Sequence, residues 1–178
     1  IEALVEGTIR TYGHLNILRG NAYGRVGKPA VEASLEDWQR TIDVTLRAAF
    51  LCAKYSIPHL LKGGGGTIVF TASIQGIVAV ANDAPYQAAK GGLLALTRSL
   101  AMDYSPTIRV NSILPGPILT PAWNGVSSED IHKVAEETML KRLGMPEEVA
   151  EVALFLASDA SSYMTGSSVI VDGGFTAK

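Results

Sequence analysis

Short apolar runs alternate with longer helical patterns along this chain, and this alternation constrains the fold more than any other feature. The apolar runs are residues 15–18, 67–72, 108–114 and 167–172. The helical patterns are residues 2–12, 35–57, 85–103 and 146–157. Apolar strands separated by helices are typical of a parallel sheet that is buried on both faces. The sequence therefore predicts an α/β fold, with helices covering both faces of a parallel sheet.

Charge and composition exclude several other classes of protein. The chain is 47% hydrophobic and 18% charged, as expected for a globular protein. Its formal net charge of -2 provides no basic field for nucleic acid or an acidic membrane surface, and we expect neither as a partner. His14, His59 and His132 lack ligand spacing, so we expect no metal. Cys52 is the single cysteine and cannot form an internal disulfide, which favours a cytoplasmic location.

Polar and glycine-rich residues follow each predicted strand. Asn21 follows the first run, Ser73 follows the second, the third is followed by "PGPILT" and the last ends in "DGG". Ligands of open parallel sheets bind beyond the carboxyl ends of the strands. These residues therefore mark one edge of the sheet as the predicted site.

Ser73, Tyr86 and Lys90 form a candidate catalytic set at that edge. Tyr86 and Lys90 are four positions apart in a predicted helix, so they lie on one face of it. A phenol has an ordinary pKa of about 10, and a nearby ammonium group lowers that pKa. A serine hydroxyl can hold a substrate oxygen beside the phenol. Such a set suits proton transfer to a carbonyl oxygen while a cofactor transfers the hydride.

These motifs resemble those of the short-chain dehydrogenase/reductase family in its single-domain form. "YQAAK" is similar to the Tyr-x-x-x-Lys motif of that family, and the spacing from Ser73 to Tyr86 (86 − 73 = 13) fits its usual pattern. "RVNSILPGPILT" resembles the family segment that lines the nicotinamide. The segment from "RLGMPEEV" to "VIVDGG" resembles its carboxyl-terminal part almost position by position.

The resemblance implies a Rossmann-like, doubly wound sheet and an NAD(P)-dependent oxidoreductase that interconverts a carbonyl and an alcohol. It implies that Tyr86 is the general acid/base, that Lys90 lowers the Tyr86 pKa and binds the nicotinamide ribose, and that Ser73 orients the substrate oxygen. The cofactor, either NAD or NADP, would be contacted by Asn21, Ala22, Tyr86, Lys90, Pro115, Gly116, Ile118 and Thr120.

The start of the chain departs from the family pattern. The family opens with a strand, a glycine-rich turn and a helix that hold the cofactor pyrophosphate. No such turn precedes residues 15–18, and the first residue is Ile1. We therefore expect residues 1–178 to be the carboxyl-terminal part of a single domain whose opening βαβαβ half is absent or incomplete. The missing part would comprise on the order of 70–90 residues.

Two departures fall within the predicted site. The family motif Asn-Asn-Ala-Gly reads "GNAY" here, so Tyr23 stands at the glycine position. Thr45 stands where the family has an asparagine that holds a water of the proton relay to the lysine. Threonine offers one donor and one acceptor group on a shorter, branched side chain. Thr45 is the catalytic candidate at the position of that asparagine, and with threonine there the relay is either rebuilt, slowed or lost.

Three further expectations concern partners and alternatives. The 86–103 helix is apolar on two sides, so it needs cover beyond that of the sheet. The family resemblance implies that a second copy supplies this cover, in a homodimer or homotetramer that packs through helices 35–57 and 86–103. Trp123, in the variable stretch 117–138, is either a substrate wall or a packing residue. The alternative function is a non-catalytic, reductase-like binding or scaffolding subunit. Thr45 favours that alternative, whereas the intact Ser/Tyr/Lys set argues against it.

Overall fold

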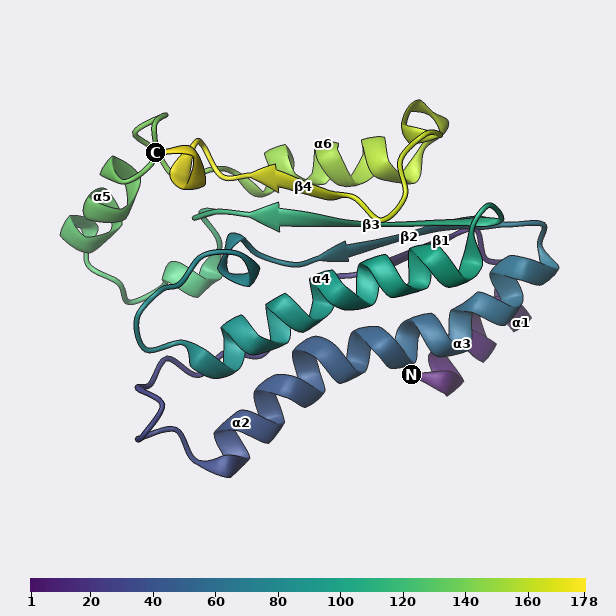
Figure 1. The fold of residues 1–178 in the computed structure, drawn as a ribbon, viewed down its shortest axis with the longest axis horizontal. Helices are drawn as coiled ribbons and strands as arrows, with labels where there is room; N and C mark the ends of the chain where they lie inside the picture. The colour runs from purple at the N-terminus through teal and green to yellow at the C-terminus, as the bar shows by residue number, and fades with distance from the viewer.

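A four-stranded parallel sheet forms the centre of the computed structural model, which describes residues 1–178 (Figure 1). The strands are β1 (Ile17–Gly20), β2 (Gly66–Thr71), β3 (Ile108–Pro115) and β4 (Ser168–Val171), and they lie in that order. Each strand pairs in parallel with its neighbour. The predicted parallel α/β fold is confirmed, and each predicted apolar run overlaps one strand.

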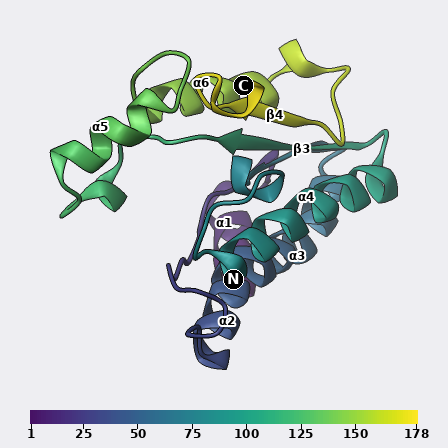
Figure 2. The same ribbon diagram turned by 60° about the vertical axis from the view of Figure 1, so that its left-hand side comes forward.

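Helices cover both faces of the sheet, as Figure 2 shows in a turned view. On one face, α3 (Ala48–Lys62) packs on β1 and β2, α4 (Ala84–Tyr104) packs on β3, and α1 (Glu2–Tyr12) packs on α3. On the other face, α6 (Pro146–Ala157) packs on β2 and β3. The remaining helices are α2 (Leu35–Ile42) and α5 (Ser128–Glu136). None of the helices combines the length and apolar character needed to span a bilayer.

Successive residues of β2 supply the two halves of the core. Ile68 and Phe70 are fully buried in the cluster between the sheet, α3 and α4. Val69 belongs to a second cluster with Val149 and Leu156 of α6. Because side chains alternate across a strand, a sheet covered on both faces needs an unbroken apolar run. This is why the β2 segment reads as continuously hydrophobic.

The long predicted helix of residues 35–57 is divided in the structure. Ser34 caps α2: its hydroxyl accepts from the Asp37 amide at 3.0 Å, and the Asp37 carboxylate accepts from the Ser34 amide at 3.1 Å. A π-helical turn, Asp43–Arg47, then separates α2 from α3. The predicted helix ends at residue 57, before Pro58, which is wrong, because α3 continues through Pro58 to Lys62. Leu60 in that last turn is fully buried, and its burial offsets the amide that Pro58 lacks.

The carboxyl ends of the strands point toward one side of the molecule, where α4 begins and α5 lies (Figure 1). The first turn of α4 therefore lies at the edge where parallel sheets bind their ligands. Asp83 is the N-cap residue, and Pro85 occupies the first turn, which suits its fixed φ and missing amide hydrogen.

Candidate active site

Ser73 and Tyr86 meet at the carboxyl edge of the sheet. Ser73 follows β2 and begins a short 3₁₀ turn, where its hydroxyl accepts from the Gln75 amide at 3.1 Å. That turn lies directly on α4, because a Cβ at Gly76 would be 3.1 Å from the Lys90 carbonyl oxygen. Only a glycine allows so close an approach without a shift. The contact brings the Ser73 side chain to the Tyr86 phenol, and hydrogen bonding between them lowers the Tyr86 pKa.

Lys90 lies one helical turn beyond Tyr86 and is almost fully buried. Its Nζ donates to the Thr71 carbonyl oxygen at 2.7 Å and lies 5.5 Å from the centre of the Tyr86 ring. Burial lowers the pKa of Lys90 to about 8, because the charged form loses hydration. The ammonium group makes no second hydrogen bond to the protein, so two of its three hydrogens lack an acceptor.

The Tyr86 phenol differs from the expectation drawn from the resemblance. The sequence analysis predicted a lowered pKa, but burial raises the Tyr86 pKa to about 12. The hydrogen bond with Ser73 and the charge of Arg25 oppose this rise, and they are weaker than the loss of hydration. In this structure the phenol therefore stays protonated at neutral pH.

Tyr23 and Arg25 also contact Tyr86, which the sequence analysis did not anticipate. The rings of Tyr23 and Tyr86 meet edge to face, with centres 6.1 Å apart. The Arg25 guanidinium carbon lies 5.7 Å from the centre of the Tyr86 ring. Arg25 Nε also donates to Asp83 Oδ2 at 2.7 Å. The sequence did contain a signal for Tyr23, because this residue stands at a position where the family has glycine. Nothing in the sequence linked Arg25 to Asp83.

Thr45 holds the loop that contains Tyr23 and Arg25. Its side chain is buried in the π-helical turn, where its hydroxyl accepts from the Gly24 amide at 2.9 Å and donates to the Gly24 carbonyl at 3.1 Å. Gly24 lies between Tyr23 and Arg25. The hydroxyl of Thr45 is thus bonded to the backbone of this loop, and its catalytic role stays a prediction.

The other predicted cofactor residues lie after β1 and β3. Asn21 and Ala22 are exposed beyond the end of β1. Pro115 ends β3, and Gly116 packs against β4, since a Cβ there would lie 2.7 Å from the Asp172 Cα. These residues share the carboxyl edge of the sheet with Ser73, and their contacts with a cofactor stay predictions.

The chain beyond Gly116 continues past the carboxyl ends of the strands to α5 (Figure 1). Ile118 pairs with Gly144, and the Thr120 hydroxyl accepts from the Ala122 amide at 3.4 Å. Trp123 Nε1 donates to the Ile118 carbonyl at 2.8 Å, so its indole is anchored to the start of this segment.

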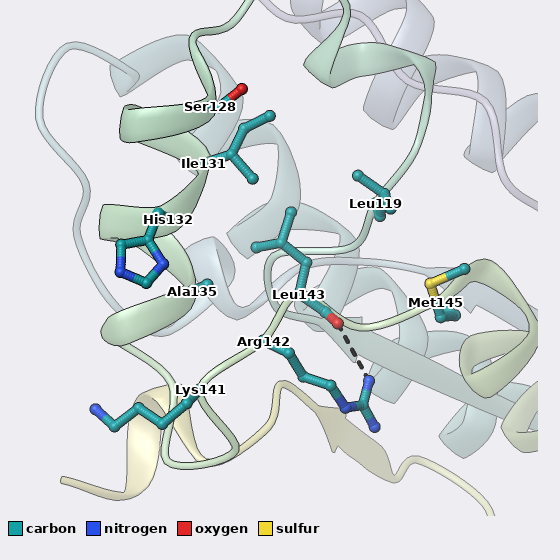
Figure 3. A pocket seen from close by; sticks show the side chains of 9 residues that line it. All are labelled: Leu119, Ser128, Ile131, His132, Ala135, Lys141, Arg142, Leu143 and Met145. Carbon is teal, nitrogen blue, oxygen red and sulfur yellow. Dashed lines mark hydrogen bonds between the residues drawn. The ribbon is translucent and has the colours of Figure 1, made fainter.

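A cavity of about 470 Å³ opens between α5 and the residues around Leu143 (Figure 3). The figure shows the apolar side chains of Ile131, Leu119 and Leu143 directed toward its centre. Its lining residues are Leu119, Ser128, Ile131, His132, Ala135, Lys141, Arg142, Leu143 and Met145. The cavity wall contains none of the Ser/Tyr/Lys set.

A Rossmann-like sheet with a serine, a tyrosine and a lysine gathered at its carboxyl edge defines a class of single-domain oxidoreductases. The family model described as "Enoyl-(Acyl carrier protein) reductase" matches residues 1–176 of this chain. The chain belongs to the short-chain dehydrogenase/reductase family.

Named relatives of this chain are dehydrogenases. Cyclohexanol dehydrogenase of Acinetobacter sp. (strain SE19) is 42% identical over all of this chain and 70% of that protein. Meso-2,3-butanediol dehydrogenase of Serratia marcescens is 38% identical over 99% of this chain and 70% of that protein. Among solved structures, the aldohexose dehydrogenase of Thermoplasma acidophilum has a TM-score of 0.95 and 31% identity. That match covers 99% of this chain and 74% of the other. The predicted family and oxidoreductase class are confirmed.

Proposed function

We propose that this chain carries the proton-transfer site of an NAD(P)-dependent enzyme that interconverts a secondary alcohol and a ketone. The observation that supports it most is the convergence of Ser73, Tyr86 and Lys90 at the carboxyl edge of the sheet. Ser73 and Lys90 are both buried, so a substrate oxygen held there would be shielded from water. Shielding strengthens each hydrogen bond to that oxygen.

Tyr86 acts in this proposal as the general acid in reduction and the general base in oxidation. A phenol with a pKa of about 12 is protonated at neutral pH, so it is ready to donate to a carbonyl oxygen. In alcohol oxidation the same oxygen must accept a proton, and the positive charge of Arg25 favours the phenolate that does so. Ser73 holds the substrate oxygen beside the phenol.

The residues present suit a nicotinamide cofactor. A buried ammonium group with two hydrogens lacking acceptors needs a ligand that offers oxygen atoms, and ribose hydroxyls supply them. Lys90 and Tyr86 would hold that ribose. The rest of the cofactor site would be lined by Asn21, Ala22, Pro115, Gly116, Ile118 and Thr120. When bound, the cofactor supplies or accepts the hydride.

The substrate class follows from the relatives together with the site. Cyclohexanol and meso-2,3-butanediol, which appear in the names of two relatives, are both secondary alcohols. We therefore propose small secondary alcohols and their ketones as substrates.

We also propose that the protein acts as a homo-oligomer through α2, α3 and α4, since Trp38, Phe50 and Met102 on these helices expose apolar surface.

The test is ketone reduction by the full-length protein, followed as loss of NADH or NADPH absorbance with cyclohexanone and acetoin. Tyr86→Phe should reduce kcat by about a thousandfold or more, because only the proton donor is removed. Tyr163→Phe is the matched control, since Tyr163 is fully exposed. Near-normal activity of Tyr86→Phe would refute the mechanism. Cofactor binding without turnover of any ketone or alcohol would favour the scaffolding alternative.

A further inference from the structure

Arg25 and Asp83 form a polar pair beside Tyr86, outside the Ser73, Tyr86 and Lys90 set. Asp83 is 1% exposed, and its Oδ2 accepts from Arg25 Nε at 2.7 Å. The Arg25 side chain is 48% exposed. The pair therefore joins a buried anion to a cation that reaches the surface beside the Tyr86 ring.

The buried carboxylate determines how the guanidinium is presented. Asp83 is the N-cap residue of α4, yet its side chain makes no capping hydrogen bond. Its Oδ1 is buried without a partner, so Arg25 is its only ionic contact. A buried charge that loses its partner is costly, which holds Arg25 Nε in place. The ion pair uses the Nε edge of the guanidinium and leaves Nη1 and Nη2 free.

The free end of Arg25 has the form of an anion-binding fork. Its four Nη hydrogens have no acceptor in the protein, and the planar arrangement of Nη1 and Nη2 matches the two oxygens of a carboxylate. The guanidinium carbon lies 5.7 Å from the centre of the Tyr86 ring. The fork therefore lies beside the ring whose hydroxyl would hold the substrate carbonyl oxygen.

We propose that Arg25, held by Asp83, binds a carboxylate of the substrate, so that the preferred substrates are keto acids and hydroxy acids. This inference rests on the proposed function and specifies its substrate class. A monoanion fits better than a phosphate dianion, because the other cations of this region are engaged. Lys28 pairs with Asp37 at 2.9 Å, and Lys90 is buried against Thr71.

The test compares matched ketones that differ in charge: levulinate with methyl levulinate, and acetoacetate with methyl acetoacetate. Wild-type full-length protein should reduce each acid with a higher kcat/KM than its ester. Arg25→Gln should lower the acid-to-ester ratio of kcat/KM about tenfold to a hundredfold, the value of one charge-assisted hydrogen-bonded contact. Lys28→Gln removes the same charge from the same loop and should leave the ratio unchanged.

A second variant guards against loss of folding. Arg25→Gln leaves the buried Asp83 carboxylate unpaired, so the double variant Arg25→Gln with Asp83→Asn restores a neutral hydrogen-bonded pair. It should fold and show the same fall in ratio. Equal losses on acid and ester in this double variant, or a wild-type preference for the esters, would overturn the inference.

Failure of the proposed function is distinguishable from failure of the inference. If the wild type reduces none of the four ketones, the proposed function fails for this substrate class. Levulinate binding is then measured by saturation-transfer NMR, a readout that needs no turnover. Wild-type binding that the double variant loses would support the carboxylate site. Equal binding by both proteins, or binding by neither, would overturn it.

Discussion

The Nζ of Lys90 lies 5.5 Å from the centre of the Tyr86 ring, and it donates its hydrogen bond to the backbone carbonyl of Thr71. Burial disfavours the charged form of both residues: the pKa of Lys90 is lowered to about 8 and that of Tyr86 is raised to about 12. The same burial that shields a reaction from water therefore costs folding free energy while Lys90 carries its charge.

Replacing Lys90 with methionine should stabilise the folded protein at neutral pH while abolishing activity. The folded pKa of about 8 lies below the ordinary value of 10.5, so the unfolded chain binds more protons between these values. Wild-type stability should therefore rise with pH in that window. The advantage of Lys90→Met should shrink by about 2 kcal/mol between pH 8 and pH 10.

Urea denaturation of wild type and Lys90→Met at several pH values measures this difference, because the other titrating groups cancel. A stability difference that does not change with pH would show that Lys90 titrates normally in the folded protein.

Ser73→Ala should reduce kcat for alcohol oxidation about a hundredfold, because one hydrogen bond to the reacting oxygen is lost. The interaction with Ser73 also lowers the Tyr86 pKa, so its loss should raise that pKa further. Oxidation needs the phenolate, and its rate should therefore begin to rise at a higher pH in Ser73→Ala than in wild type. The pH profile of kcat is the measurement. Ser73→Thr keeps a hydroxyl and should retain the wild-type profile.

Thr45→Val should destabilise the protein by about 1–3 kcal/mol, because the Gly24 amide and carbonyl lose their hydroxyl partner in a buried position. Valine has nearly the same shape, so the effect reports the hydrogen bonds and not a cavity. Thr45→Ser is the control and should restore most of the stability. Urea denaturation measures the stability, and kcat of the same variants measures the proton relay. If Thr45 replaces the family asparagine, fully folded Thr45→Val should have a lower kcat than wild type, and Thr45→Ser should restore the wild-type kcat.

The sequence predicted the sheet and the Ser73, Tyr86 and Lys90 set because these depend on local patterns. Buried parallel strands need continuous apolar runs, and a helix spacing of four places Tyr86 and Lys90 on one face. The capping box of Ser34 and Asp37 is equally local. Each of these features can be identified within a short window of the chain.

The contacts around Tyr86 depend instead on residues that are distant in the sequence. Arg25 and Asp83 meet only after β1 and α4 are placed in the fold, and no spacing rule relates them. The raised pKa of Tyr86 also follows from burial, which the chain acquires on folding. The π-helical turn that contains Thr45 lies within an otherwise continuous helical pattern, so no residue pattern marks a helix boundary there.

Arg109 of β3 holds the end of α6 to the sheet, and replacing it should cost about 3 kcal/mol of stability. Its guanidinium donates to the carbonyl oxygens of Leu156 and Ser158 at 3.1 and 3.0 Å, and to Ser161 O at 3.0 Å. These carbonyls lie at or just beyond the carboxyl end of α6, where a cation is favoured and the last acceptors lack helical partners. Several charge-assisted hydrogen bonds are therefore lost together in Arg109→Met.

The denaturant midpoint of Arg109→Met should fall with an unchanged m-value, measured beside Arg98→Met, which alters an exposed arginine of α4. Arg109→Lys should recover only part of the loss, because one ammonium group cannot reach the acceptors of both Nη1 and Nη2. Arg109 lies near the start of β3, at the opposite end from the Ser73 edge. The folded fraction of Arg109→Met should therefore keep the wild-type kcat. If the denaturant midpoint of Arg109→Met equals that of the wild type, α6 is held to the sheet by its apolar contacts with Val69 and Ile113 alone.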